Sequence, residues 1–174
     1  MKQILSLLQP NRRYTPSVKI HGEDIAELNR QATAYKDKKN WDSALACLYR
    51  AREVALLQSE AQTVAQLLRL PLFLQQAGYF EGAKYELVYL IENMMAFIKL
   101  ETKGFDCMKF QTAFYKEIYL EAICNKAALI FKREKNKETS ALFKKMAAEH
   151  TEKRIAAFDA LTAARKEVLR KRRF

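Results

Sequence analysis

From residue 23 onward, apolar residues recur three or four positions apart, which is the spacing of one buried face of an α-helix. Glu23 and Asp24 favour the positive end of a helix dipole, so a first long helix is expected to begin there. Lys38-Lys39-Asn40 interrupts the pattern, and Asn40 can cap a second helix that starts at Trp41. The two apolar stripes are Leu28, Ala32 and Tyr35, and then Ala44, Leu48 and Ala51.

The next apolar stretch predicts two further helices. Ser59 and Gln62 have the spacing of a capping box, which indicates the start of a third helix that ends at Gly78 in a left-handed conformation. Pro71 lies inside this helix, and because proline lacks an amide hydrogen we expect a kink there. A fourth helix is predicted from Phe80 to about Leu100.

Two long helices are predicted after a break at Gly104. Apolar residues are dense from 105 to 133, and Asn136 or Thr139 can open a final helix that reaches the C-terminus. At a rise of 1.5 Å per residue, each of these helices spans roughly 40–50 Å.

Residues 1–22 lack this pattern over most of their length. They hold two of the three prolines, Pro10 and Pro16, and each biases the residue before it away from helix. We therefore expect an extended N-terminal arm over residues 1–22, with a short helical turn at Ile4–Leu8.

The sequence repeats itself with a period of 39 residues. Trp41-Asp42-Ser43-Ala44 aligns with Phe80-Glu81-Gly82-Ala83, and the apolar residues on either side align as well. The aligned pairs are Leu28 with Leu67, Ala32 with Pro71, Tyr35 with Leu74, Leu48 with Leu87, and Ala51 with Leu90.

This pattern resembles the tetratricopeptide repeat, in which two antiparallel helices pack with large and small apolar residues at set positions. In residues 25–56 the signature is carried by Leu28, Ala32, Tyr35, Trp41, Ala44, Leu48 and Ala51. In residues 64–95 it is carried by Leu67, Leu74, Gly78, Phe80, Ala83 and Leu87. Pro71 and Leu90 replace small residues of the family, and the period exceeds the usual value of about 34 residues.

The resemblance implies an all-α fold, a tetratricopeptide-like array of helical hairpins that forms a short α-solenoid with long C-terminal helices. Residues 23–174 would form one helical-repeat domain, with hairpins at 23–58 and 59–103 and an elongated, degenerate third hairpin at 105–173. One hairpin cannot bury its apolar face alone, so its neighbours must stack on it. An irregular helical bundle is the alternative.

Composition agrees with a folded helical protein, since Gly (4) and Pro (3) are scarce and 49% of the residues are apolar. No apolar run approaches the roughly 20 residues of a membrane-spanning helix. Gln9-Pro10-Asn11-Arg12-Arg13 stands where a signal peptide would carry its cleavage site. We expect a cytoplasmic protein whose cysteines, Cys47, Cys107 and Cys124, stay reduced.

Catalytic and metal-binding patterns are missing from the sequence. His21 and His150 lie far from each other and show no zinc-ligand spacing with the cysteines, and the glycines form no phosphate-binding loop. Cys47 and Cys124 fall on packed helices and are expected in the core, whereas His150 lies in a polar stretch and is expected to be solvated. We predict no metal, no cofactor and no enzyme activity.

The resemblance points to one candidate binding surface. In the resembled family, ligand-contacting side chains project from the first helix of each pair. At the matching positions this chain has Asn29, Thr33 and Lys36 in the first unit and Arg69, Leu72 and Gln76 in the second. The Lys/Asn/Arg clamp of the family's chaperone-binding members is not matched, because Asn29 and Thr33 stand where Lys and Asn are expected. The alternative is that these residues are merely solvated.

A second candidate surface is aromatic. Phe110, Phe114, Tyr115 and Tyr119 cover a broad arc of their predicted helix. Such an arc is typical of a core helix, and it also suits a subunit interface or a groove for an apolar peptide.

A third candidate surface is basic, since the net charge of +11 is concentrated at the two ends of the chain. Residues 132–174 contain 14 basic and six acidic residues, whereas residues 23–131 are close to neutral. The candidate phosphate contacts are Arg165, Lys166, Arg170, Lys171, Arg172 and Arg173. They can bind nucleic acid, act as an import signal, or only stabilise the helix end and aid solubility.

These observations lead to a hypothesis with two alternatives. The leading function is a non-enzymatic adaptor or chaperone-like protein that binds a peptide or helix of another protein on a helical-repeat surface. The first alternative is a nucleic-acid-associated protein that uses its basic C-terminal helix. The second is a homo-oligomer formed through the aromatic helix.

Overall fold

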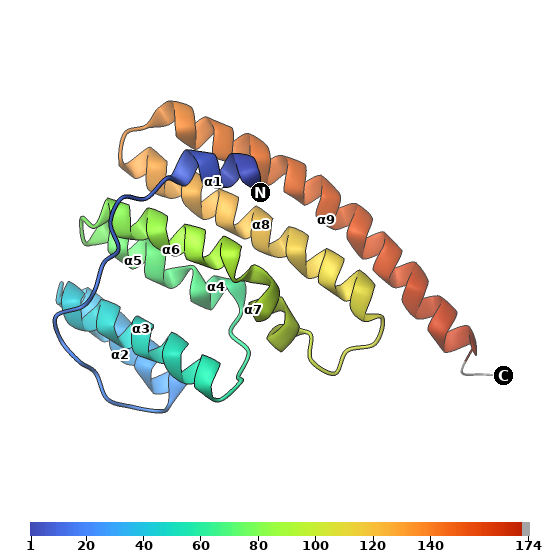
Figure 1. Ribbon diagram of the computed structural model, residues 1–174, viewed down its shortest axis with the longest axis horizontal. Coiled ribbons are helices and arrows are strands. Elements are labelled where there is room, and N and C mark those ends of the chain that lie inside the picture. The colour runs from blue at the N-terminus through green and yellow to red at the C-terminus, as the bar shows by residue number, and fades with distance from the viewer. Residues whose placement is uncertain (172–174) are drawn as a thin grey trace.

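The protein is all-α in the computed structural model, which describes residues 1–171, and this part of the chain contains no strand (Figure 1). The first helices are α1 (Lys2–Leu8), α2 (Ile25–Asp37), α3 (Trp41–Leu57), α4 (Val64–Leu67) and α5 (Arg69–Gln76). They are followed by α6 (Phe80–Glu92), α7 (Met94–Glu101), α8 (Met108–Arg133) and α9 (Lys137–Lys171). No helix in the described part of the chain is both long and apolar enough to cross a membrane.

Three antiparallel helix pairs dominate the architecture. α2 packs against α3, α5 against α6, and α8 against α9, and each pair is joined by a short connection (Figure 1). The central pair lies between the other two, because α5 contacts α3 on one side and α8 on the other. The long helix α9 runs past the end of α8, so that its C-terminal part projects beyond the other helices (Figure 1).

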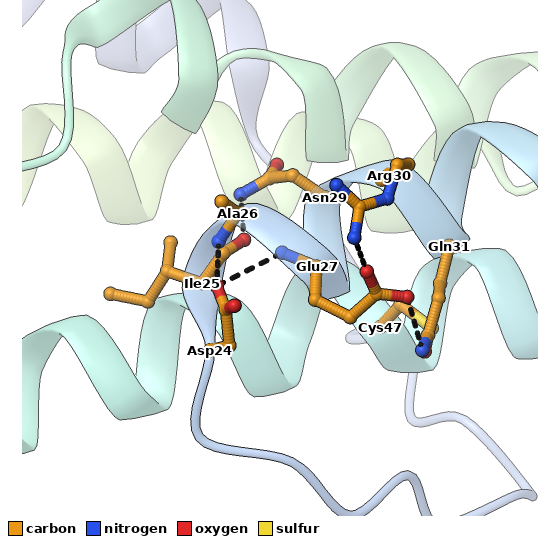
Figure 2. Close-up of polar contacts among 8 residues, drawn as sticks. All are labelled: Asp24, Ile25, Ala26, Glu27, Asn29, Arg30, Gln31 and Cys47. Carbon is orange, nitrogen blue, oxygen red and sulfur yellow. Dashed lines mark hydrogen bonds and ion pairs between the residues drawn. The ribbon is translucent and has the colours of Figure 1, made fainter.

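Several helix ends form where the sequence predicts them. Asp24 caps α2 by accepting hydrogen bonds from the amides of Ala26 and Glu27, at 2.8 and 3.1 Å, as Figure 2 shows. Asn40 caps α3 and Asn136 caps α9 in the same way, each accepting from the amide three residues on. Gly78 and Gly104 take φ angles of 86° and 82°, which confirms the left-handed residue at the first and the break at the second.

The predicted capping box at Ser59 and Gln62 is wrong. Ser59 takes a φ of 54° and ends α3 instead, with the Glu60 amide donating to the Ala55 carbonyl at 2.8 Å. The capping box forms four residues later, where the Thr63 hydroxyl accepts from the Gln66 amide and the Gln66 side chain accepts from the Thr63 amide. Both pairs have the same spacing, so spacing alone did not select the right one.

Two predicted single helices are each broken in two. The expected kink near Pro71 falls at Leu68, between α4 and α5, because the proline ring clashes with the carbonyl four residues before it, that of Leu67. The helix predicted from Phe80 to about Leu100 is interrupted at Asn93. At the junction of α6 and α7, the Asn93 side-chain amide donates a hydrogen bond to the Tyr89 carbonyl at 2.9 Å.

One continuous core runs through the three pairs, and aromatic contacts connect them. Trp41 at the start of α3 meets Phe73 of α5 edge-on, with ring centroids 6.2 Å apart. Phe80 at the start of α6 meets Phe131 of α8 in the same geometry at 5.3 Å. Cys47 and Cys124 are fully buried, which confirms their predicted place in the core, and burial raises the pKa of the Cys124 thiol to about 12.

The N-terminal segment is also part of this core. α1 packs against α6, and its Ile4 and Leu8 are 1% and 0% exposed. Residues 9–24 contain no helix and cross α6 and α3 on their way to α2. The segment predicted as an arm is therefore a short helix with one buried face, followed by an extended strap.

Candidate protein-binding surfaces

Arg69 brings three of the six residues predicted on the first helices into contact. From the start of α5 its Nη1 donates to Asn29 Oδ1 at 2.6 Å, and its Nη2 donates to the Asn29 carbonyl at 3.1 Å and to Thr33 Oγ1 at 2.8 Å. Figure 2 shows the Asn29 side chain projecting from α2 on the side away from Cys47. Arg69 thus joins the first helix of one pair to the first helix of the next.

Phe73 lies one turn further along α5 and carries two cations on its ring. The Arg69 guanidinium is 5.4 Å and the Lys36 ammonium 5.7 Å from the ring centroid. Lys36 also pairs with Asp37 at 3.2 Å, whereas the acceptors of Arg69 are neutral groups and no described carboxylate pairs with it. Burial lowers the pKa of Arg69, as expected for a charge that lacks a counter-charge.

Leu72 and Gln76 complete the predicted set. Leu72 is half-buried and packs on the core, and Gln76 is exposed at the end of α5. We define the α2–α5 face as Asn29, Thr33, Lys36, Arg69, Leu72 and Gln76. It is a cationic, partly apolar surface, in which Arg69 fixes Asn29 and Thr33.

Asp42 holds the N-terminal strap, which the sequence did not indicate. Its carboxylate, in the first turn of α3, accepts hydrogen bonds from the Tyr14 hydroxyl, the Ser17 hydroxyl and amide, and the Val18 amide. Partial burial raises the pKa of Asp42, but the hydrogen bonds from Ser17, Tyr14 and the two amides outweigh it and the pKa lies below its usual value. Both oxygens of the charged Asp42 carboxylate accept hydrogen bonds from the strap.

Tyr14 is the anchor of the strap. Its ring lies 4.4 Å from the Tyr79 ring and 6.4 Å from the Tyr49 ring. Gly82 makes room for it, because a Cβ added to Gly82 would lie 2.9 Å from the Tyr14 Cβ. The strap and the turn before α6 form the walls of an open groove of about 750 Å³ beside these rings.

A buried ion pair lies between α3 and α6. Glu86 is 1% exposed and binds Arg52, while the Tyr49 hydroxyl donates to its other oxygen at 2.9 Å. The Arg52 guanidinium also stacks on Tyr89, 4.3 Å from the ring centroid. The sequence held a signal that was missed, since Glu86 comes three residues after Ala83 and four before Leu90 on a buried stripe.

The four aromatic residues predicted as an interface on α8 separate into different environments. Tyr119 is fully buried, and its hydroxyl donates to Glu101 at 2.9 Å, so it is not available to a partner. Tyr115 and Phe114 are half-buried, and Phe114 contacts Phe158 of α9 with ring centroids 5.5 Å apart. Phe110 is 39% exposed. The surface that remains is therefore smaller than predicted.

The basic C-terminal residues are exposed as far as the structure describes them. Arg170 and Lys171 both pair with Glu167, at 3.2 and 3.5 Å, whereas Arg165 and Lys166 form no ion pair with a described residue. The predicted contacts Arg172 and Arg173 lie outside the described residues. Leu169, which lies among the described basic residues of α9, is an apolar side chain that is 58% exposed.

The prediction that His150 is solvated is wrong. His150 is 9% exposed and lies between α8 and α9, with its Nδ1 2.6 Å from a Glu117 oxygen. One turn on, Arg154 binds Glu121 at 2.6 Å. The polar neighbours of His150 in sequence point outward, because in a helix the residues next to an inward-facing side chain face solvent.

No group of three or more His, Cys, Asp and Glu in the described part of the chain is placed to hold a metal ion. The chain matches no protein-family model, no curated protein and no solved structure.

Proposed function

We infer that the protein is a non-enzymatic, cytoplasmic interaction module that binds an acidic segment of a partner protein on the α2–α5 face. The inference combines the repeat pattern of the sequence with the surface that the first helices form. The proposed scaffold is a tetratricopeptide-like array, in which α2–α3, α5–α6 and α8–α9 are successive units.

The repeated contact between neighbouring pairs supports an array. Trp41 and Phe80 are equivalent in the sequence repeat, and each meets an aromatic ring on the first helix of the following pair. Ala32 and Ala44 are fully buried between α2 and α3, as small residues at a close helix crossing should be. The same relation at two successive junctions is expected of stacked repeats and is not required of an irregular bundle.

Arg69 is the reason for proposing this surface and an acidic ligand. Three of its five N–H donors are used within the described chain, and all of their acceptors are neutral. A carboxylate from a partner would supply the missing counter-charge and accept from the remaining donors. Lys36 and Gln76 extend the surface at the C-terminal ends of α2 and α5. An acidic residue of the partner therefore meets positive charge, and adjacent residues meet an amide and Leu72.

Affinity capture from native lysate tests this function, because it measures whether a protein partner depends on the face. We expect the wild-type protein to retain a protein partner after nuclease treatment. Gln76→Glu places a negative charge on the face without removing an internal contact, and it should weaken capture of an acidic partner about tenfold. Gln3→Glu, at an exposed glutamine of α1, is the matched control.

Arg69→Met is the stronger variant and should abolish capture, with circular dichroism showing that the helices remain. Equal capture by wild type, Gln76→Glu and Arg69→Met would contradict the proposal. Recovery of nucleic acid alone, lost at high salt, would favour the basic part of α9 as the functional surface instead.

A further inference from the structure

One side of α9 carries a half-exposed apolar stripe, in which Phe158 contacts Phe114 of α8 and Leu169 borders a groove formed with residues 104–107. Ile155, Phe158 and Leu169 are 55%, 50% and 58% exposed. With Thr151, Thr162 and Arg165 they follow alternate spacings of three and four residues, the heptad pattern of a two-helix seam. The residues that face α8, among them His150 and Leu161, lie on a different side of the helix.

Charged residues follow the outer edge of this stripe and change sign along it. Asp159 comes directly after Phe158, and Lys166 lies one heptad later, directly after Arg165. Neither Asp159 nor Lys166 forms an ion pair within the described chain. The edge is therefore acidic towards the body of the molecule and basic towards its tip.

We propose that this stripe of α9 pairs antiparallel with the same stripe of a second copy of the chain. Reversing one helix brings Asp159 of each copy against Lys166 of the other, so both charged edges are neutralised at once. In that register Phe158 faces Leu169 of the second copy, and Thr162 faces Arg165. A two-fold interface requires this reciprocity, since residue i contacts residue j and j contacts i.

The charges argue against other occupants. In a parallel pair Lys166 would lie opposite Leu161 of the other copy, so neither copy of Lys166 would gain a carboxylate partner. A nucleic acid or an anionic surface would meet Lys166 but would also meet Asp159 and cover Phe158 and Ile155. A copy of the same helix satisfies both signs and covers Phe158 and Leu169.

The fold leaves room for this pairing. Residues 158–169 correspond to about 18 Å of helix at 1.5 Å per residue. Phe158 lies beside Phe114 of α8, and towards its C-terminal end α9 projects past the end of α8 (Figure 1). Because the body of each molecule is joined to the N-terminal part of its own α9, an antiparallel pair puts the two bodies at opposite ends. The α2–α5 face is separate from this interface, so the proposal does not depend on the proposed function.

Charge reversal provides a test that simple loss of folding cannot imitate. Light scattering and sedimentation equilibrium of the full chain should give a mass twice that of the 20.2 kDa chain at high concentration. Asp159→Lys alone and Lys166→Asp alone should each weaken association about tenfold, because two symmetric pairs become repulsive. The double variant, Asp159→Lys with Lys166→Asp, should restore it.

Leu169→Glu should abolish association, whereas Leu57→Glu, at a leucine that is 74% exposed on α3, should leave it unchanged. Circular dichroism of every variant establishes that the helices remain. A chain that stays monomeric at all concentrations would overturn the proposal. So would a dimer that survives Leu169→Glu, or one that the double variant fails to restore.

Discussion

At the scale of single residues, one carboxylate decides where the N-terminal segment lies. Asp42 accepts four hydrogen bonds from a strap that otherwise has little secondary structure of its own. An ionised acceptor forms stronger hydrogen bonds than a neutral one, so the charge of Asp42 matters as well as its shape.

Asp42→Asn keeps the shape and removes the charge, and we expect it to lower the free energy of unfolding by about 2 kcal/mol. The pKa of Asp42 is lower in the folded protein than in the unfolded chain. Its stabilising contribution is therefore complete above the unfolded pKa of about 4 and is lost as pH falls through the folded pKa.

Urea denaturation of both proteins from neutral to acid pH measures this contribution. The difference between wild type and Asp42→Asn should be constant near neutrality and shrink below about pH 4. Glu53→Gln, at an exposed surface ion pair with Arg50, is the control and should cost much less. A difference that grows towards acid pH would show that the charge of Asp42 is not what holds the strap.

Single residues were predicted well where helical position decides their environment and poorly where a distant helix does. Cys47 and Cys124 were placed in the core from the stripes on which they lie, and they are buried. His150 was placed in solvent because its sequence neighbours are polar, but Glu117 of α8 supplies a partner from 33 positions away. A buried pair of this kind can be predicted from sequence only when it is already known that the two helices pack together and which of their faces meet.

At the scale of helices, the boundaries set by a residue's own conformation were predictable. Asn40 and Gly78 act on the turn that contains them, and both do what their residue types favour. The capping box at Thr63 and the break at Asn93 are different, because the local sequence allows a helix end at more than one position and tertiary packing decides between them. Neither the α2–α5 face nor the stripe of α9 depends on these two boundaries.

Gly82 is a helical residue whose role is set by another element. Alanine there should favour the α6 helix by roughly 1 kcal/mol, but its Cβ would lie 2.9 Å from the Tyr14 Cβ. We expect Gly82→Ala to be destabilising overall, because Tyr14 must leave its place between Tyr79 and Tyr49.

Hydrogen exchange measures the effect where it occurs. The amides of Ser17 and Val18 should exchange faster in Gly82→Ala, since the strap no longer reaches Asp42. Ser43→Ala, at the equivalent position of the first repeat, should leave both amides protected. A stabilised Gly82→Ala protein with a protected strap would mean that Tyr14 does not need the space that glycine leaves.

At the scale of the whole molecule, the two aromatic junctions distinguish an array from a bundle. In an array each pair contacts only its neighbours, so damage at one junction should stay near that junction. Trp41→Ala should cost roughly 3 kcal/mol and loosen α2 and α3, and Phe80→Ala should do the same to α8 and α9.

Residue-resolved hydrogen exchange of the two variants separates these outcomes. We expect two different patterns of accelerated exchange, one at each end of the chain, with Phe105→Ala at an exposed ring as the control. The same uniform acceleration in both variants would mean that the helices form one cooperative bundle.

The place of α1 also affects how the chain folds as it is made. The helix leaves the ribosome well before its partner α6, which ends at Glu92, more than 80 residues later. At about 5–20 residues per second, α1 waits roughly 4–17 s before its docking surface exists. During that interval Ile4 and Leu8 face water or another protein, so the nascent chain offers chaperones an apolar segment that the finished molecule conceals.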